Sequence, residues 1–180
     1  MFAGSEWRLA AGALYTLLLV IACITDVRWR RIPNLLVGVL ALGGLAFSVA
    51  AEPWWPGLFR AVTGLVLGFA IWIIFHIAGG LGAGDVKLFA AAGAWLGPSG
   101  AWRAALVAAL VGGVLSLVVL AWQRRTREGV ERVALSFSML SLAPLGTVSP
   151  GAERKAYLPY GVALACGALL TAWIPGLIAN

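Results

Sequence analysis

The sequence predicts an all-α membrane protein, a polytopic bundle of about six transmembrane helices with its N-terminus outside the cytoplasm. Three observations support this fold class. Of the 180 residues, 62% are hydrophobic and only 11% are charged, a far more apolar balance than that of soluble domains. Apolar windows close to the roughly 20 residues that cross a hydrocarbon core recur along the chain. The segments between them are short, so we expect one integral membrane domain over residues 1–180.

Five windows are long enough to span a membrane, and a sixth is short. In chain order they are residues 9–24, 35–51, 58–77, 86–96, 101–122 and 158–178. The short window, 86–96, forms only about 17 Å of helix, against a bilayer core of roughly 30 Å. Either its outer end is recessed, or its first residues begin below the inner surface. Residues 133–148 contain Pro144 and Gly146, which favour an interfacial or re-entrant segment over a seventh span.

The basic residues set the predicted orientation, because positively charged loops tend to stay in the cytoplasm. An outside N-terminus leaves only Arg8, Arg60 and Arg103 on the outer face. The remaining basic residues then face the cytoplasm, namely Arg28, Arg30, Arg31, Lys87, Arg124, Arg125, Arg127, Arg132, Arg154 and Lys155. Because these are scattered over three loops, the net charge of +6 indicates contact with anionic lipid headgroups, and we expect no nucleic-acid binding.

The tryptophans and the two cysteines are expected to have structural roles. Most tryptophans fall near predicted helix ends, as in an interfacial belt: Trp7, Trp29, Trp54, Trp55, Trp95, Trp102, Trp122 and Trp173. Cys23 and Cys166 form no CxxC pair and no plausible metal cluster, so we expect apolar packing, no metal and no cofactor. The stretch "VIAC" (20–23) resembles a lipoprotein processing site, but the weakly basic N-terminal region favours a retained helix.

Two of the seven acidic residues are aspartates, and both lie at helix ends on the predicted cytoplasmic side. Asp26 closes the first window in "CITDVRWRRIPN", and Asp85 opens the short one in "GAGDVKLF". Two facing carboxylates cannot both ionise easily, so one can act as a base towards water while the other, protonated, polarises a peptide carbonyl. The glycines of "GGLGAGD" permit non-helical backbone and leave room for an extended peptide.

Other interpretations of these residues stay open at this point. Asp85 is compatible with a helix N-cap, and Asp26 with an ion pair to a neighbouring arginine. His76 is compatible with a donor to the site, but a lone histidine with a satisfied structural hydrogen bond is more common. A small proton or cation carrier also uses intramembrane acids, although the chain shows no clear internal repeat. Two GxxxG pairs, at Gly64 with Gly68 and Gly93 with Gly97, favour packing within the chain over dimerisation and leave the oligomeric state open.

Three stretches resemble the type IV prepilin peptidase family of intramembrane GxGD aspartyl proteases. They are "TDVRWRRIPN" (25–34), "GGLGAGDVKLFAAAGAWLG" (79–97) and "YLPYGVALACGAL" (157–169). The chain is most similar to the short form found in Flp, or tight-adherence, pilus systems. The resemblance implies that Asp26 and Asp85 cleave prepilin leaders, commonly after glycine, at the cytoplasmic face of the bacterial inner membrane. It implies that further residues shape the site: Gly82, Gly84, Lys87, Arg31, Pro33, Asn34, Pro159, Tyr160 and Gly161.

The departures from the family pattern limit this expectation. Larger members carry a cytoplasmic segment with paired CxxC motifs and also methylate the new N-terminus. This sequence has no such motifs, so we expect neither methyltransferase activity nor a zinc site. Preflagellin peptidases and signal-peptide peptidases share the GxGD motif, but "RRIPN" after Asp26 favours prepilin processing. A non-catalytic assembly factor is disfavoured because both aspartates are intact. Lys87 is compatible with tuning the acids, holding a phosphate, or snorkelling to the interface.

Overall fold

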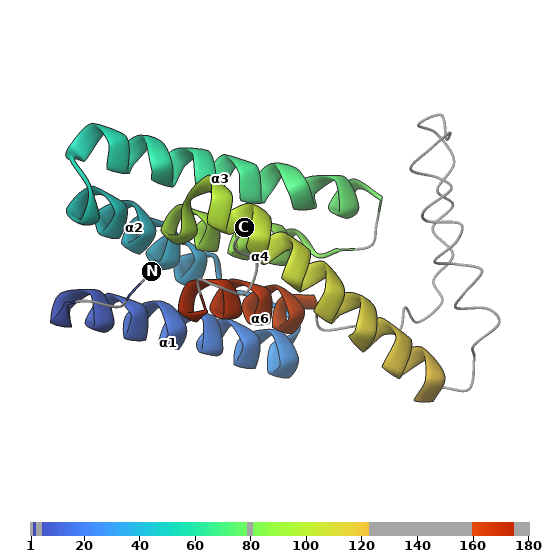
Figure 1. Cartoon of the computed structure of the whole chain (residues 1–180). Coiled ribbons are helices and arrows are strands. Elements are labelled where there is room, and N and C mark those ends of the chain that lie inside the picture. The colour runs from blue at the N-terminus through green and yellow to red at the C-terminus, as the bar shows by residue number, and fades with distance from the viewer. Residues whose placement is uncertain (1, 3–4, 79–80, 123–159, 175–180) are drawn as a thin grey trace.

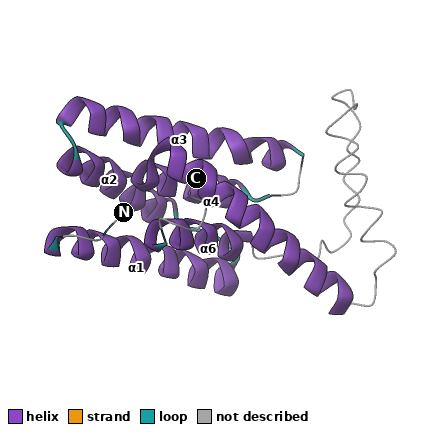
Figure 2. Cartoon of the chain, in the orientation of Figure 1, coloured by secondary structure: helices purple, strands orange, loops and turns teal. Residues whose placement is uncertain are grey.

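The computed structural model describes residues 2, 5–78, 81–122 and 160–174, which form a bundle of helices (Figure 1). The helices are α1 (Glu6–Trp29), α2 (Asn34–Ala51), α3 (Trp54–Ile77), α4 (Ala83–Trp122) and α6 (Tyr160–Trp173). Figure 2 shows helices and short loops, with no strand in the described part of the chain. The all-α prediction is therefore confirmed there. Residues 133–148 and Pro159 lie outside the described residues.

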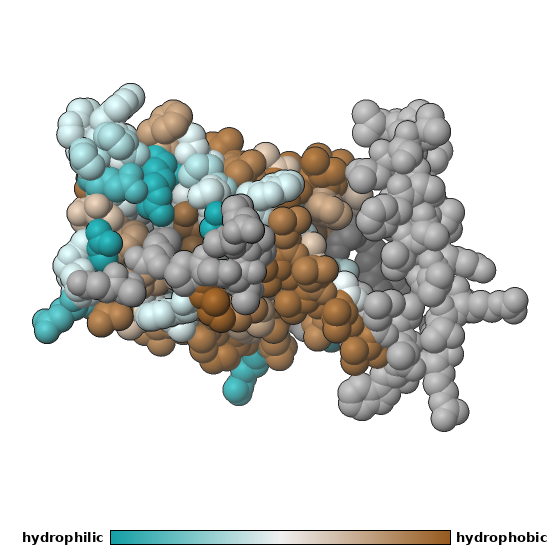
Figure 3. All heavy atoms as spheres, viewed as in Figure 1, coloured by the Kyte–Doolittle hydropathy of each residue, from teal (hydrophilic) through white to brown (hydrophobic). Residues whose placement is uncertain are grey.

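Four helices are long and apolar enough to cross a membrane: α1, α2, α3 and the Ala83–Leu115 part of α4. The described part of α6 has 14 residues, about 21 Å, and is shorter than a usual span. Large apolar side chains face outward, including Leu35 (81% exposed), Ile77 (72%) and Leu110 (71%). Figure 3 shows apolar residues over much of one face. Such a surface suits lipid and is unusual for a soluble monomer. The count of about six spans and the outside N-terminus stay predictions.

Helix α4 reverses direction at Gly97. That residue has φ 71° and ψ 177°, a conformation that glycine adopts readily, and Pro98 after it cannot continue a hydrogen-bond ladder. A Cβ on Gly112 would touch Tyr160 in the first turn of α6, and the same turn meets Asp85. A straight helix would separate residues 85 and 112 by about 40 Å. The predicted windows 86–96 and 101–122 are thus two segments of α4, 83–96 and 98–122, joined by a sharp turn instead of a loop (Figure 1).

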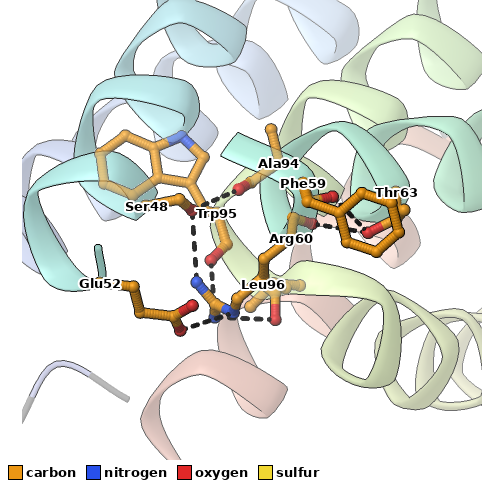
Figure 4. A network of polar contacts seen from close by, with 8 residues as sticks. All are labelled: Ser48, Glu52, Phe59, Arg60, Thr63, Ala94, Trp95 and Leu96. Atoms are coloured by element: carbon orange, nitrogen blue, oxygen red, sulfur yellow. Dashed lines mark hydrogen bonds and ion pairs between the residues drawn. The ribbon is translucent and has the colours of Figure 1, made fainter. Parts of the chain in front are cut away.

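Polar side chains from α2 and α3 satisfy the end of the first α4 segment (Figure 4). Nη2 of Arg60 donates to the carbonyl oxygens of Trp95 (3.3 Å) and Leu96 (3.2 Å). Oγ of the buried Ser48 donates to the Ala94 carbonyl at 3.1 Å and accepts from Nη1 of Arg60 at 3.3 Å. A helix end leaves its last carbonyls without intrahelical partners. These contacts let the segment stop inside the protein at Gly97.

Glycines allow close contact between α3 and the first α4 segment. A Cβ on Gly64 would collide with the carbonyl oxygen of Gly93, and one on Gly93 with that of Gly64. A Cβ on Gly68 would lie 3.1 Å from the Phe89 carbonyl oxygen. The two GxxxG pairs therefore pack against each other within the chain, as predicted.

An aromatic cluster fills the bundle between α1, α2 and the C-terminal ends of the first α4 segment and α6. Phe2 is 1% exposed, and its ring lies 5.2–6.2 Å from those of Tyr15, Phe47, Trp95 and Trp173. The placement of Trp95 in an interfacial belt is wrong. Trp95 is 1% exposed, and its Nε1 donates to the Leu40 carbonyl at 2.7 Å. It is buried because the rings of Phe2, Tyr15 and Phe47, all remote in sequence, pack against it.

Candidate active site

Asp26 lies near the C-terminal end of α1, where the chain turns away from the bundle. Helix α1 ends at Trp29, and Arg30 adopts a left-handed conformation (φ 53°, ψ 31°) with its N–H bonded to the Asp26 carbonyl at 2.8 Å. Pro33, extended at φ −60° and ψ 131°, then precedes α2. The Asp26 residue is 2% exposed. The site therefore holds a carboxylate inside the bundle while the basic residues that follow it are exposed.

Asp85 is the third residue of α4, so its interpretation as the N-cap residue is wrong. The carbonyl of Gly82 accepts the N–H groups of Asp85 (3.1 Å) and Val86 (3.3 Å). Gly82, the residue before Ala83, is therefore at the cap position of α4. The Asp85 side chain reaches back towards this cap position, where a Cβ on Gly82 would lie 3.1 Å from its Oδ2. Asp85 is 6% exposed, and its Oδ1 accepts no hydrogen bond from the described part of the chain.

The two carboxylates meet beside Gly161. A Cβ placed on Gly161 would lie 2.6 Å from Oδ2 of Asp26 and 3.1 Å from Oδ1 of Asp85. One point is thus close to both oxygens, which cannot be farther apart than the sum of these distances. The predicted convergence of Asp26 and Asp85 is confirmed. The site is built from the C-terminal end of α1 and the N-terminal ends of α4 and α6.

The first described turn of α6 brings backbone close to the two carboxylates, since Gly161 is its second residue. Sγ of Cys23, one turn before Asp26, lies 4.0 Å from the Gly161 carbonyl oxygen. The sequence interpretation of Cys23 as apolar filling missed this contact, for which it held no signal.

The remaining predicted site residues form a layer around the acids. Gly82 lies against Asp85, since a Cβ there would be 3.1 Å from Oδ2. Gly84 faces Ile32 at an ordinary 3.5 Å. Nζ of the exposed Lys87 donates to Oδ1 of Asn34 at 3.4 Å, which links α4 to the start of α2. The structure thus favours a solvent-exposed hydrogen bond between two helices as the role of Lys87, over direct contact with the acids.

Tyr160, partly buried, packs towards Gly112, where a Cβ would lie 3.7 Å from its ring. Arg31 and Pro33 are exposed on the connection from α1 to α2, and Pro159 lies outside the described residues. Among the described residues, no group of three or more His, Cys, Asp or Glu side chains is placed to hold a metal ion.

Comparison with known proteins places this arrangement in a family. The model of the type IV leader peptidase family matches residues 13–118, which include both aspartates. A prepilin leader peptidase/N-methyltransferase of Dickeya chrysanthemi is 34% identical over 73% of this chain and 49% of its own. One of Bacillus subtilis (strain 168) is 35% identical over 52% of this chain and 38% of its own.

A third relative is the type 4 prepilin-like proteins leader peptide-processing enzyme of Escherichia coli O78:H11, 35% identical over 63% of this chain and 44% of its own. The chain spans about half the length, or less, of these curated relatives. No solved structure matches it. The family match covers more than half of the sequence and both carboxylates that meet beside Gly161. The chain therefore belongs to the type IV leader peptidase family.

Proposed function

We propose that this protein is a prepilin leader peptidase in which Asp26 and Asp85 activate water. The observation that carries the proposal is the meeting of two buried carboxylates at one glycine, Gly161. The names of relatives from several bacteria point to the substrate class. Metal-independent hydrolysis by two aspartates needs one ionised and one protonated carboxyl group, a state that close approach favours.

The chemistry follows from these two protonation states. The ionised carboxylate takes a proton from a water molecule as the water oxygen bonds to the scissile carbonyl carbon. The protonated carboxyl group gives its proton to the carbonyl oxygen, which produces a tetrahedral diol. The first group then protonates the leaving nitrogen as the C–N bond breaks, and the second regains its proton from a diol hydroxyl. Both acids return to their starting states, and no covalent enzyme intermediate forms.

The proposed setting is the bacterial inner membrane, with the site at the cytoplasmic face. Four span-capable helices support a membrane location. The exposed Arg28, Arg30 and Arg31 directly follow Asp26, as expected for a cytoplasmic end. The proposal keeps about six spans and an outside N-terminus. It assigns peptidase activity alone, and the N-methyltransferase in the relatives' names is a separate activity that the same assay measures.

Cleavage of pilin-type precursors tests the proposal. The protein is purified in detergent and mixed with a small precursor panel, and mass spectrometry identifies the new N-terminus and any added methyl group. Wild type is expected to cut at one bond after glycine. Asp26→Asn and Asp85→Asn should each lower the rate by at least about 10³-fold, because the acids act as a unit. Glu6→Gln, at the exposed start of α1, is the matched carboxylate control and should keep full activity. Full cleavage by either Asp variant would refute the proposed mechanism.

A further inference from the structure

His76 contacts the segment of chain that leads into Asp85. It lies in the last turn of α3, is partly buried, and its Nδ1 is 2.8 Å from the Leu81 carbonyl oxygen. A carbonyl oxygen only accepts hydrogen bonds, so Nδ1 must carry the proton and donate it. Leu81 itself is 8% exposed and belongs to the hydrophobic core. The histidine therefore holds a buried carbonyl at a fixed place beside α3.

The Leu81 carbonyl and the Gly82 N–H belong to one peptide group. The described backbone has no cis peptide bond, so the C=O and N–H of this group point in opposite directions. Gly82 also lies against the Asp85 carboxylate, since a Cβ there would be 3.1 Å from Oδ2. One planar amide thus has His76 on its oxygen, and the residue that carries its nitrogen lies against the acid.

The next peptide group is held as well. The Gly82 carbonyl accepts the N–H groups of Asp85 and Val86, so Gly82 also holds the first turn of α4 through its carbonyl group. Glycine has more conformational freedom than any other residue, and Gly82 is exposed. Its orientation therefore depends on external contacts. Among the described residues, the His76 side chain donates the hydrogen bond that ties this turn to the neighbouring helix α3.

We propose that His76 is a positioning residue that acts on Asp85 through the Leu81–Gly82 peptide group. The inference rests on the proposed peptidase function and adds a residue to the same site. His76 holds the amide, the amide orients the carboxylate, and the carboxylate faces Asp26 beside Gly161. Removing the imidazole donor frees the glycine turn and lets the Asp85 side chain leave its reactive orientation while the helices stay packed.

Three variants separate this role from simple packing. His76→Leu removes the donor, and His76→Asn keeps an N–H near the position of Nδ1. Phe75→Leu changes the neighbouring, half-exposed side chain and serves as the control. In a prepilin cleavage assay, His76→Leu should lower kcat about 10- to 100-fold with KM changed less than about twofold, since small misplacements of reacting groups have effects of this size. His76→Asn should recover most of the loss, and Phe75→Leu should match wild type.

Amide hydrogen exchange gives a second measurement that does not depend on activity. Peptides covering residues 81–86 should exchange faster in His76→Leu than in wild type, His76→Asn and Phe75→Leu, with equal melting temperatures. Unchanged exchange and kcat in His76→Leu would overturn the inference while leaving the peptidase intact. A loss that asparagine fails to restore would also overturn it. Absence of cleavage by wild type would refute the proposed function, and with it the positioning role of His76 in catalysis, whatever the exchange data show.

Discussion

Adding one methyl group at Gly161 is expected to disable the site without weakening the fold. The Cβ of Gly161→Ala would lie 2.6 Å from Oδ2 of Asp26 and 3.1 Å from Oδ1 of Asp85. Ordinary carbon–oxygen contacts are about 3.3–3.6 Å, so the Asp26 oxygen must retreat by close to 1 Å. Displacement by about 1 Å costs on the order of 10²-fold in rate. We expect Gly161→Ala to lower kcat by at least that factor.

The two glycines of the GxGD motif test smaller versions of the same steric perturbation. In Gly82→Ala the new Cβ would lie 3.1 Å from Oδ2 of Asp85, so the carboxylate must shift by a few tenths of an ångström. We expect an intermediate loss of kcat, about threefold to 20-fold. In Gly84→Ala the nearest atom is Cβ of Ile32 at 3.5 Å, an ordinary contact. That variant should keep wild-type kcat.

The assay is prepilin cleavage at saturating substrate, with melting temperature measured on the same samples. Positions 84 and 161 are helical, where alanine is favoured over glycine by roughly 0.5–1 kcal/mol, so neither variant should melt earlier on propensity grounds. The expected order of kcat is Gly84→Ala, then Gly82→Ala, then Gly161→Ala. An active Gly161→Ala, or a Gly84→Ala as damaged as Gly161→Ala, would refute the steric reasoning.

Two further predictions concern stability, read as melting temperature in detergent. Arg60→Met removes the donors to the carbonyls of Trp95 and Leu96 and should lower the free energy of unfolding by about 1–3 kcal/mol. Glu52→Gln loses only a half-exposed ion pair to Arg60 at 3.5 Å and should lower it by less than about 1 kcal/mol. Equal effects would contradict the capping role. Trp95→Phe removes the buried hydrogen bond to the Leu40 carbonyl and should lower the free energy of unfolding by about 1–3 kcal/mol. Trp102 is 53% exposed, so Trp102→Phe should have little effect. The reverse order would show that Trp95 is not a core residue.

Local patterns in the sequence were sufficient to predict where the two aspartates lie. Apolar windows of known length fix where helices end, and two acids at helix ends on one side were expected to converge. The windows 86–96 and 101–122 predict two separate helices, and the structure joins them at Gly97. The roles of Gly161 and its neighbours came from family resemblance alone, since no spacing within residues 157–169 points to an acid more than 70 residues away.

Contacts between remote residues could not be predicted. Arg60 was treated only as an outward-facing charge, whereas it caps the carbonyl groups before Gly97. Trp95 was assigned to an interface because it lies near a window end, and the rings of Phe2, Tyr15 and Phe47 bury it. For His76 both interpretations were open, and the structure supplies a bonded partner, Leu81, in the segment that precedes Asp85. Each case depends on which helices pack together, which hydrophobic periodicity does not determine.

The depth of the acids follows from the register between α3 and α4. Gly68 packs against Phe89 and Ala90, and the two helical segments run antiparallel. Asp85 precedes this contact by four to five residues, so it lies level with residues 72–73 of α3, which continues to Ile77. At 1.5 Å per residue, Asp85 is recessed by about 7 Å from that helix end. At the other end of the segment Gly97 lies against Arg60, six residues after α3 begins, so that end is recessed by about 9 Å as well. The short window therefore meets both alternatives: its outer end is recessed, and its acid begins inside the bundle.

A recessed site constrains what the proposed peptidase can cut. A substrate must carry its scissile bond about 7 Å past the end of α3 in extended form, beside carboxylates whose surroundings are already closely packed. Gly161 has no room for a methyl group, whereas the exposed Gly82 presents bare backbone next to Asp85. The proposed cleavage after glycine fits this packing, because glycine is the smallest residue that a substrate can bring to the two carboxylates.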